Sequence, residues 1–462
     1  MTDKDQNSQN IIDIYNEGEE WVQNLGDKTI HAKRMQGRFR LIKWFSTLIW
    51  TPFFFLPYIT WNNRQAILFD TENRMYYIFD ITIFPQDVWL LTMVLLFLAI
   101  LLAFMTTILG RVFCGYFCFQ TVWTDIFTKI EEFFEGNPSQ RRKLEKAPWS
   151  LNKIIKKIAK HTIWLGIALL SGVTWMLYFN VNWADYFNGN TSFTTISITL
   201  IIALGVYVFA GFMREQTCLW ICPYARIQGA MIDKQSVLPA YNYNRGESRG
   251  KLIKGEHNPE KGDCIDCHQC VAVCPTGVDI RKGQEYGCIT CGLCIDACDS
   301  VMEKIGKPKG LILYTSFDTL KSNKAQKPFY KRPRILLYAS ILLFSFGMII
   351  YGLKTLAPLE FKVLHGRSPL FVKLSDGSVR NKYYLKIVNK TAKTKFVDIK
   401  IESNIANLKI QGDTKKVKIS VGASGSNIIY LSAKPKDATS ESVVFIVNDG
   451  TTEIRYTSKF FK

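Results

Sequence analysis

Eight of the twelve cysteines form two closely spaced runs. In each run two residues separate the first three cysteines, and three residues precede the fourth. The first run is Cys264, Cys267, Cys270 and Cys274, and the second is Cys288, Cys291, Cys294 and Cys298. Three closely spaced thiolates can surround one corner of a cuboidal cluster, and this spacing is that of bacterial ferredoxins with two clusters. The sequence therefore predicts two 4Fe-4S clusters.

The fourth cysteine of each run is expected to bind the cluster of the other run. This crossed arrangement assigns the first cluster to Cys264, Cys267, Cys270 and Cys298. It assigns the second cluster to Cys288, Cys291, Cys294 and Cys274.

The same cysteines could instead bind zinc or haem. Paired C-x-x-C units can hold zinc, but four cysteines per run, with Pro275 after the fourth of the first run, fit cubanes better than separate tetrahedral sites. The segment from Cys264 to His268 matches the haem-attachment pattern C-x-x-C-H. Both of its cysteines belong to the ferredoxin run, and haem is attached outside the membrane, whereas this segment is expected inside. We therefore prefer the iron-sulfur interpretation.

The other four cysteines form two C-x-x-x-C pairs, each just after an arginine. The pairs are Cys114 with Cys118 after Arg111, and Cys218 with Cys222 after Arg214. On one helix, residues four apart share a face, so each pair is expected to present two sulfurs to a soft metal, to a further cluster, or to each other on oxidation. The arginines would favour thiolates. The alternative is that these cysteines are small apolar packing residues.

An apolar segment, an arginine, a cysteine pair and an amphipathic basic connection occur in this order twice. Such repetition indicates an internal duplication. The two halves would bring all four thiols together at one membrane interface.

Five segments are long and apolar enough to cross a bilayer, whose hydrocarbon core takes about 20 helical residues to span. They are residues 41–61, 88–109, 162–181, 196–213 and 335–356. Pro52 and Pro57 are expected to kink the first segment. The sequence thus predicts a multidomain membrane protein with an α-helical bundle of about five transmembrane helices.

The charge distribution predicts which loops face the cytoplasm. The chain has 58 Lys and Arg against 39 Asp and Glu, a net charge of +19. The connection between the second and third spans is rich in Lys and Arg, whereas residues 182–195 contain none. By the positive-inside rule, residues 1–40, this connection and residues 214–334 are expected in the cytoplasm of a bacterium, and the carboxyl terminus on the periplasmic side of its inner membrane. No nucleic-acid binding is expected, because the basic residues flank spans.

The segment 1–40 is polar with mixed charge, so we expect no cleavable signal peptide. Residues 41–213 would form the first four spans, 214–334 a cytoplasmic segment with a ferredoxin domain at about 255–315, and 335–356 the fifth span. Residues 357–462 contain alternating runs at 382–388, 396–401, 417–421, 428–432 and 442–447, separated by turn residues. This pattern predicts an exported all-β sandwich of the immunoglobulin-like type.

The sequence also closely resembles the cytochrome c oxidase accessory proteins of the CcoG/FixG type, which are membrane polyferredoxins. The resemblance covers roughly residues 40–314. It is carried by WNNRQAILFD (61–70), PQD (85–87), GRVFCGYFC (110–118), QTVWTD (120–125), REQ (214–216), CPYAR (222–226), YNRGE (243–247) and CDSVMEKIG (298–306). Phe119 stands where the first motif of that family usually has proline.

The resemblance implies a cupric reductase, an oxidoreductase that converts Cu(II) to Cu(I) during assembly of a cbb3-type cytochrome c oxidase. The candidate copper site would be Cys114, Cys118, Cys218 and Cys222. Implied partners are membrane lipid, a cytoplasmic electron donor, and oxidase subunits or copper chaperones, with a homo-oligomer possible. Two alternatives remain open: a quinol-oxidising polyferredoxin subunit, and a non-enzymatic oxidase assembly scaffold.

Overall fold

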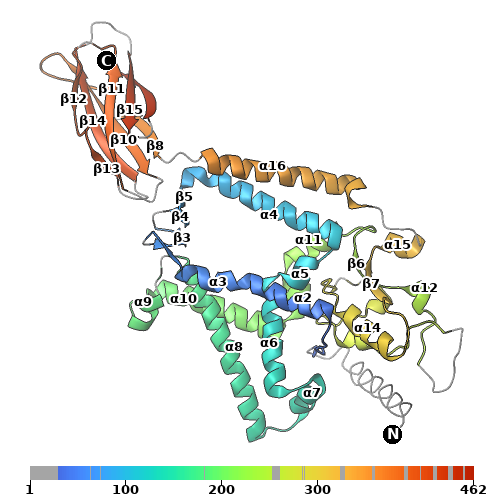
Figure 1. Ribbon diagram of the computed structural model, residues 1–462. Helices are drawn as coiled ribbons and strands as arrows, with labels where there is room; N and C mark the ends of the chain where they lie inside the picture. Colours follow the sequence, from blue (N-terminus) through green and yellow to red (C-terminus); the bar gives the residue numbers. More distant parts are fainter. Residues whose placement is uncertain are drawn as a thin grey trace. The chain divides into compact units, whose positions relative to one another are not determined.

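The computed structural model describes residues 30–462, except 63, 73, 180, 182, 252–260, 284, 286, 323–327, 356–358, 390–393, 406, 420–423, 435–440, 451–452 and 462. Most of the predicted amino-terminal segment 1–40 lies outside these residues. The chain forms two compact units (Figure 1). The first unit comprises residues 1–55, 93–177 and 181–347, and the second comprises 56–92, 178–180 and 348–462.

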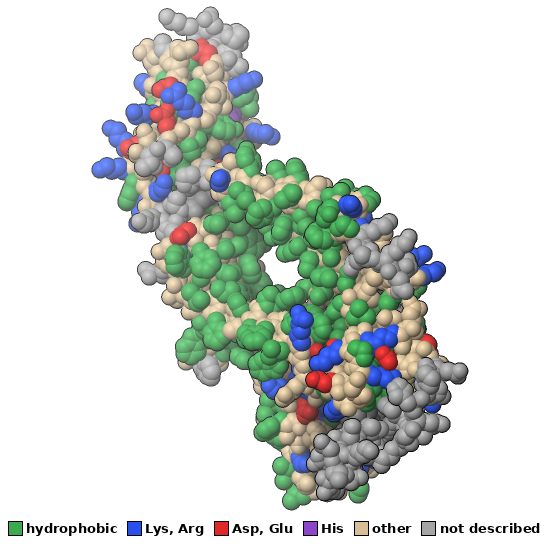
Figure 2. Space-filling model, turned by 45° about the vertical axis from the view of Figure 1, so that its right-hand side comes forward, with side chains coloured by type: hydrophobic (Ala, Val, Ile, Leu, Met, Phe, Trp, Pro, Cys, Tyr) green, Lys and Arg blue, Asp and Glu red, His purple; other side chains and the backbone are tan. Residues whose placement is uncertain are grey.

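Three helices are long and apolar enough to cross a membrane. They are α4 (Val88–Leu109), α10 (Phe193–Val206) with its π-helical continuation η4 (Tyr207–Met213), and α16 (Pro333–Thr355). Their large side chains, such as Leu95, Leu204 and Leu343, are exposed, and exposed hydrophobic side chains cover broad areas in Figure 2. A surface of this kind is stable against lipid rather than water. Three of the five predicted spans are thus confirmed as apolar helices of spanning length.

The two other predicted spans take different forms. Residues 41–61 are divided among α2 (Arg38–Thr47), η1 (Leu48–Trp50), α3 (Thr51–Phe55), η2 (Leu56–Tyr58) and the start of a hairpin. Two prolines in this stretch interrupt regular helical hydrogen bonding. Residues 162–177 belong to α8 (Leu151–Leu177), whose first turns carry several lysines, so only its carboxyl-terminal part is apolar. That these two segments cross the membrane stays a prediction.

Short antiparallel strands, which were not predicted, follow η2 in the second unit. They are β1 (Thr60–Trp61), β2 (Arg64–Gln65), β3 (Ile67–Asp70), β4 (Met75–Ile78) and β5 (Ile81–Ile83). Strand β1 pairs with β2, and β4 pairs with both β3 and β5.

The segment that carries the cysteine runs is built around one two-stranded sheet and one helix. Strand β6 (Leu238–Tyr241) pairs antiparallel with β7 (Ile312–Thr315), with Leu238 opposite Thr315. Helix α14 (Leu293–Lys304) packs against this strand pair and against the short α13 (Gln269–Ala272). The core between them includes cysteines from both runs, so the cysteine loops form part of the folded interior.

The carboxyl-terminal region is a two-sheet sandwich, as predicted (Figure 1). One sheet contains β8 (Leu359–His365), β9 (Val372–Lys373), β10 (Val379–Asn389), β12 (Lys409–Gln411) and β14 (Ser424–Ala433). The other contains β11 (Lys395–Ser403), β13 (Val417–Ile419), β15 (Glu441–Asn448) and β16 (Glu453–Phe460). Alternate residues such as Tyr383, Leu385 and Phe445 are fully buried between the sheets. Residues 420–421 of one predicted strand lie outside the described residues.

Candidate iron-sulfur and thiol site

The four cysteines assigned to the first cluster line one cavity. These are Cys264, Cys267, Cys270 and Cys298, which come from both runs. Apolar side chains from α14 and β7, among them Met302 and Ile312, complete the wall. In the second group, the charges of Cys291, Cys288 and Cys274 all act on Cys294, as does that of Cys270 from the first group. The cavity therefore brings three cysteines of the first run together with the fourth of the second, and the ligand set of the second cluster stays a prediction.

The loops of the two runs turn at matching positions. Asp266 and Thr290, which precede the second cysteine of their runs, have φ of 54° and 51°. His268 and Gly292, which follow it, have φ of 58° and 73°. These left-handed residues fold each run into a tight loop, a conformation that costs energy for residues other than glycine. The repeated geometry explains how closely spaced cysteines face one common point.

The donor set fits an iron-sulfur cluster. Burial raises the pKa of Cys267 to about 11 and that of Cys288 to about 12. Burial also raises the pKa of Cys270 and Cys294 well above the usual range. Buried thiolates therefore need a strong positive charge, which bound iron supplies. Among the described residues, no three or more Cys, His, Asp or Glu side chains are arranged as a metal site. The two groups are therefore defined by which cysteines lie near one another, and not by distances to a metal.

The two C-x-x-x-C pairs do not lie on continuous helices, which corrects the expected one-face geometry. Cys114 lies in α5 (Val112–Tyr116), and Cys118 is the extended residue that precedes α6 (Phe119–Glu135). Cys218 lies in the π-helical turn η5 (Thr217–Ile221), and Cys222 is the extended residue before α11 (Pro223–Met231). In both pairs the chain bends at the second cysteine, so that this residue stands at a helix amino terminus. The predicted duplication is visible in this shared geometry.

The missing proline in the first motif does not alter this bend. Cys118 has φ −64° and ψ 129°, and Cys222 has φ −73° and ψ 108°. Pro223 occupies the first position of α11, where proline is favoured. Phe119 takes the same position in α6 and stacks on Trp123, with ring centroids 4.2 Å apart. In this chain α6 thus begins with a stacked aromatic residue, at the position where the family usually has a proline that favours a helix start.

The structure brings the four thiols of these pairs into one neighbourhood. The charges of Cys118 and Cys222 both act on Cys114, and those of Cys114, Cys118 and Cys222 act on Cys218. Burial raises the pKa of Cys114 to about 11 and that of Cys218 to about 12, while the charge of Arg111 opposes both shifts. We call Cys114, Cys118, Cys218 and Cys222 the thiol cluster.

Two buried polar residues, Gln228 and Arg111, lie beside Cys114 of the thiol cluster. The Cys114 Sγ donates to Oε1 of Gln228, at 3.0 Å, and Gln228 comes from α11, the helix that follows Cys222. The Gln228 amide in turn donates to the Tyr224 hydroxyl, at 2.8 Å. Arg111 is buried, and its charge acts on Cys288 as well as on the thiol cluster.

The first cysteine pair packs directly against the loop that carries Cys291. Cys114 shares a buried hydrophobic cluster with Ile289 and Cys291. At Gly115 the two backbones are so close that an added Cβ would lie 2.6 Å from the Ile289 carbonyl oxygen. The Tyr116 hydroxyl donates to the Cys291 carbonyl oxygen, at 2.8 Å. The thiol cluster and the second ferredoxin group therefore form one continuous site.

A buried ion cluster fixes the second cysteine pair relative to α6. Glu131 of α6 lies 2.8 Å from Arg214, 3.1 Å from Arg141 and 3.2 Å from Lys160. All four side chains are almost fully buried. Burial by itself would raise the pKa of Glu131, but Arg214, Lys160 and Arg141 lower it to about 2. Nothing in the sequence singles out Glu131, because an acidic residue in an amphipathic helix normally faces solvent.

Replacing Glu131 by glutamine is expected to destabilise the protein by about 3–5 kcal/mol, because the buried Arg141 and Arg214 lose this carboxylate, whereas Lys160 keeps Glu135 at 2.8 Å. Denaturant unfolding of the detergent-purified protein measures this change. Glu145→Gln is the matched control, since Glu145 is 63% exposed and is 3.5 Å from His31. It should change stability by less than about 0.5 kcal/mol. Equal effects of the two substitutions would contradict the role of Glu131.

The low pKa of Glu131 also predicts a pH dependence. A carboxylate whose pKa falls on folding stabilises the folded protein above its unfolded pKa, here 4.5, and this contribution is lost as pH falls toward about 2. Unfolding measured across this range should show a steeper acid loss of stability in the wild type than in Glu131→Gln. Parallel pH profiles would contradict the assignment.

Three protein-family models match parts of this chain. Residues 213–317 match the 4Fe-4S dicluster domain, and residues 349–462 match the IG-like fold at the C-terminus of FixG. Residues 90–138 match a 4Fe-4S binding domain, a range that includes Cys114 and Cys118. With three apolar helices of spanning length, these matches define a membrane-associated iron-sulfur electron-transfer protein.

Curated relatives identify the family. The nitrogen fixation protein FixG of Rhizobium meliloti is 38% identical, and the match covers 85% of this chain and 84% of that protein. The proteins RdxA and RdxB of Cereibacter sphaeroides are 36% and 37% identical, over 87% and 81% of this chain and 89% and 82% of their own lengths. The chain belongs to the FixG family, also described as the CcoG/FixG type.

Proposed function

We propose that this protein is a cupric reductase, which reduces Cu(II) to Cu(I) during assembly of a cbb3-type cytochrome c oxidase. The ferredoxin domain would take up electrons from a cytoplasmic donor. The thiol cluster would bind copper as the substrate, because thiolates are soft ligands that favour Cu(I) over Cu(II). The periplasmic sandwich would contact oxidase subunits or copper chaperones.

The crossed ligand sets are part of this proposal. Cys264, Cys267, Cys270 and Cys298 would hold one 4Fe-4S cluster, and Cys288, Cys291, Cys294 and Cys274 would hold the other. When bound, such clusters supply reversible one-electron transfer over a wide range of potentials. The cavity lined by the first set and the mutual electrostatics of the second support this assignment.

The contact between the first cysteine pair and the Cys291 loop is the observation that carries the proposal. Tyr116 and Gly115 hold Cys114 against the backbone of that loop. No long side chain separates the two groups at Gly115, because the backbones themselves approach there. This arrangement is suited to passing single electrons from the ferredoxin domain to a metal at the thiol cluster.

Copper reduction by the chemically reduced protein tests the proposal. The wild type is compared with a variant in which Cys114, Cys118, Cys218 and Cys222 are all serine, under a Cu(I)-specific indicator and without oxygen. We expect the variant to lose copper reduction and to keep its iron. Retained reduction would remove the thiol cluster from the mechanism. A loss of iron would show instead that these cysteines hold a further cluster, the alternative suggested by the family match at residues 90–138.

A further inference from the structure

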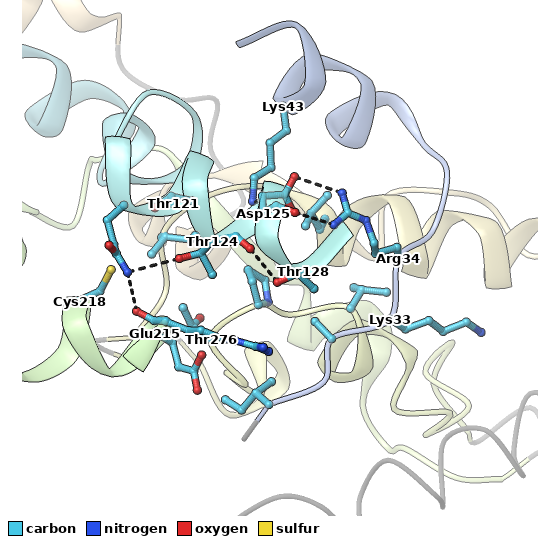
Figure 3. Close-up of a pocket in the computed structure, with 18 of the residues that line it drawn as sticks. Lys33, Arg34, Lys43, Thr121, Thr124, Asp125, Thr128, Glu215, Cys218 and Thr276 are labelled. Carbon is cyan, nitrogen blue, oxygen red and sulfur yellow. Dashed lines mark hydrogen bonds and ion pairs between the residues drawn. The ribbon is translucent and has the colours of Figure 1, made fainter. Parts of the chain in front are cut away.

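A pocket in the first unit leads to the thiol cluster. It lies between α2, α6 and the residues next to Cys274, and Cys218 is part of its lining. Figure 3 shows Cys218 and Glu215 at one end of this pocket and Lys33 and Arg34 at the other. A small molecule in the pocket would therefore contact one sulfur of the thiol cluster.

Positive charge dominates the lining. Five basic side chains face two acidic ones, Asp125 and Glu215; the basic ones are Lys33, Arg34, Arg40, Lys43 and Arg214. Fields of this sign concentrate anions and repel cations, most strongly where low-dielectric walls surround the site. Hydrated Cu(II) would be disfavoured here.

Lys43 is a lining residue whose charge is only weakly compensated. Its side chain is only 2% exposed, and its closest carboxylate oxygen is Oδ1 of Asp125, at 3.9 Å. Arg40 already binds both oxygens of Asp125, at 3.1 and 3.2 Å, and Arg34 binds one, at 3.3 Å. The Lys43 ammonium makes no hydrogen bond to any residue that the structure describes. An ammonium with so long an ion pair can take a further anionic partner from the pocket.

We propose that copper enters this pocket as an anionic complex, with carboxylate groups of its carrier bound by Lys43 and the metal at Cys218. The inference rests on the proposed function and specifies its substrate class. Cys218 releases its thiol proton to solvent as its sulfur binds the metal, and one electron from the reduced ferredoxin domain converts Cu(II) in the complex to Cu(I). The complex then carries one more negative charge, so the basic lining stabilises the product more than the substrate.

Rates of oxidation of the reduced, full-length protein by two copper complexes of opposite charge test this inference. The probes are dianionic Cu(II)-EDTA and dicationic Cu(II)-bis(ethylenediamine), mixed with protein in a stopped-flow instrument. Lys43→Met should slow oxidation by the anionic complex about tenfold at low ionic strength and leave the cationic complex unslowed. For each complex, the rate with the variant is divided by the rate with the wild type. The different reduction potentials of the two complexes therefore do not affect the comparison. Lys129→Met is the control, since Lys129 is exposed on α6 and outside the pocket.

Binding of redox-inert Zn(II)-EDTA, measured by calorimetry, gives a second readout that needs no electron transfer. It should be weakened in Lys43→Met and unchanged in Lys129→Met. Equal slowing of both copper complexes, or Zn(II)-EDTA binding that does not depend on Lys43, would overturn the inference. If neither copper complex oxidised the reduced protein while Zn(II)-EDTA still bound through Lys43, the proposed function would fail and the anion pocket would stand.

Discussion

Gly115→Leu is expected to slow copper reduction by about 10- to 100-fold while both ferredoxin clusters remain assembled. A Cβ at this position would lie 2.6 Å from the Ile289 carbonyl oxygen and 3.2 Å from the Cys291 Cα, so α5 must move away from the loop. Displacements of about 1 Å at a reacting centre commonly cost up to two orders of magnitude in rate. Gly115→Ala should show a smaller loss in the same direction, measured with the Cu(I) indicator.

Gly166→Leu is the matched control for this prediction. Gly166 lies in α8, and an added Cβ there would meet no heavy atom within 4 Å. Iron content and the EPR signal intensity of each variant show whether the clusters are intact. A Gly115→Leu protein that keeps its iron and reduces copper at the wild-type rate would rule out this contact as the electron path.

Cys298→Ala is expected to abolish the cluster of the first cysteine run and to remove about half of the ferredoxin iron. The reason is that Cys298 lines the cavity formed by Cys264, Cys267 and Cys270, although it belongs to the second run. Its EPR spectrum and redox titration should therefore match those of Cys264→Ala. By the same argument Cys274→Ala should match Cys288→Ala.

Serine variants at these positions distinguish the loss of a cluster ligand from unfolding of the protein. A serine oxygen can retain a cluster at a shifted reduction potential. If each run held its own cluster, the EPR spectrum and redox titration of Cys298→Ala would instead match those of Cys288→Ala. That outcome would refute the crossed assignment.

The spacing of the cysteines predicted much of this architecture because metal chemistry constrains it locally. Residues that bind one cluster must fold into one tight loop, and the left-handed Thr290 and Gly292 repeat the positions of Asp266 and His268. The sandwich was predictable for a related reason: alternation along β10 and β15 reflects burial between two sheets. Both features arise from short-range patterns.

Long-range contacts could not be predicted in this way. A helical spacing was expected for Cys114 and Cys118, but the chain bends at Cys118, and Phe119 at the start of α6 stacks on Trp123. The burial of Glu131 depends on cations that come from α7 (Pro138–Lys146), α8 and the residue after η4. No local pattern separates such a carboxylate from an exposed one.

The central claim is that electrons held by the ferredoxin domain reach copper at the thiol cluster. A single-turnover experiment tests it most directly: anaerobic, pre-reduced protein in detergent is mixed with Cu(II) and the Cu(I) indicator, while cluster absorbance is followed. We predict that one Cu(I) forms for each electron lost from the clusters, and that serine at all four thiol positions leaves the clusters reduced. Cu(I) formation without cluster oxidation, or at an equal rate in the serine variant, would contradict this account.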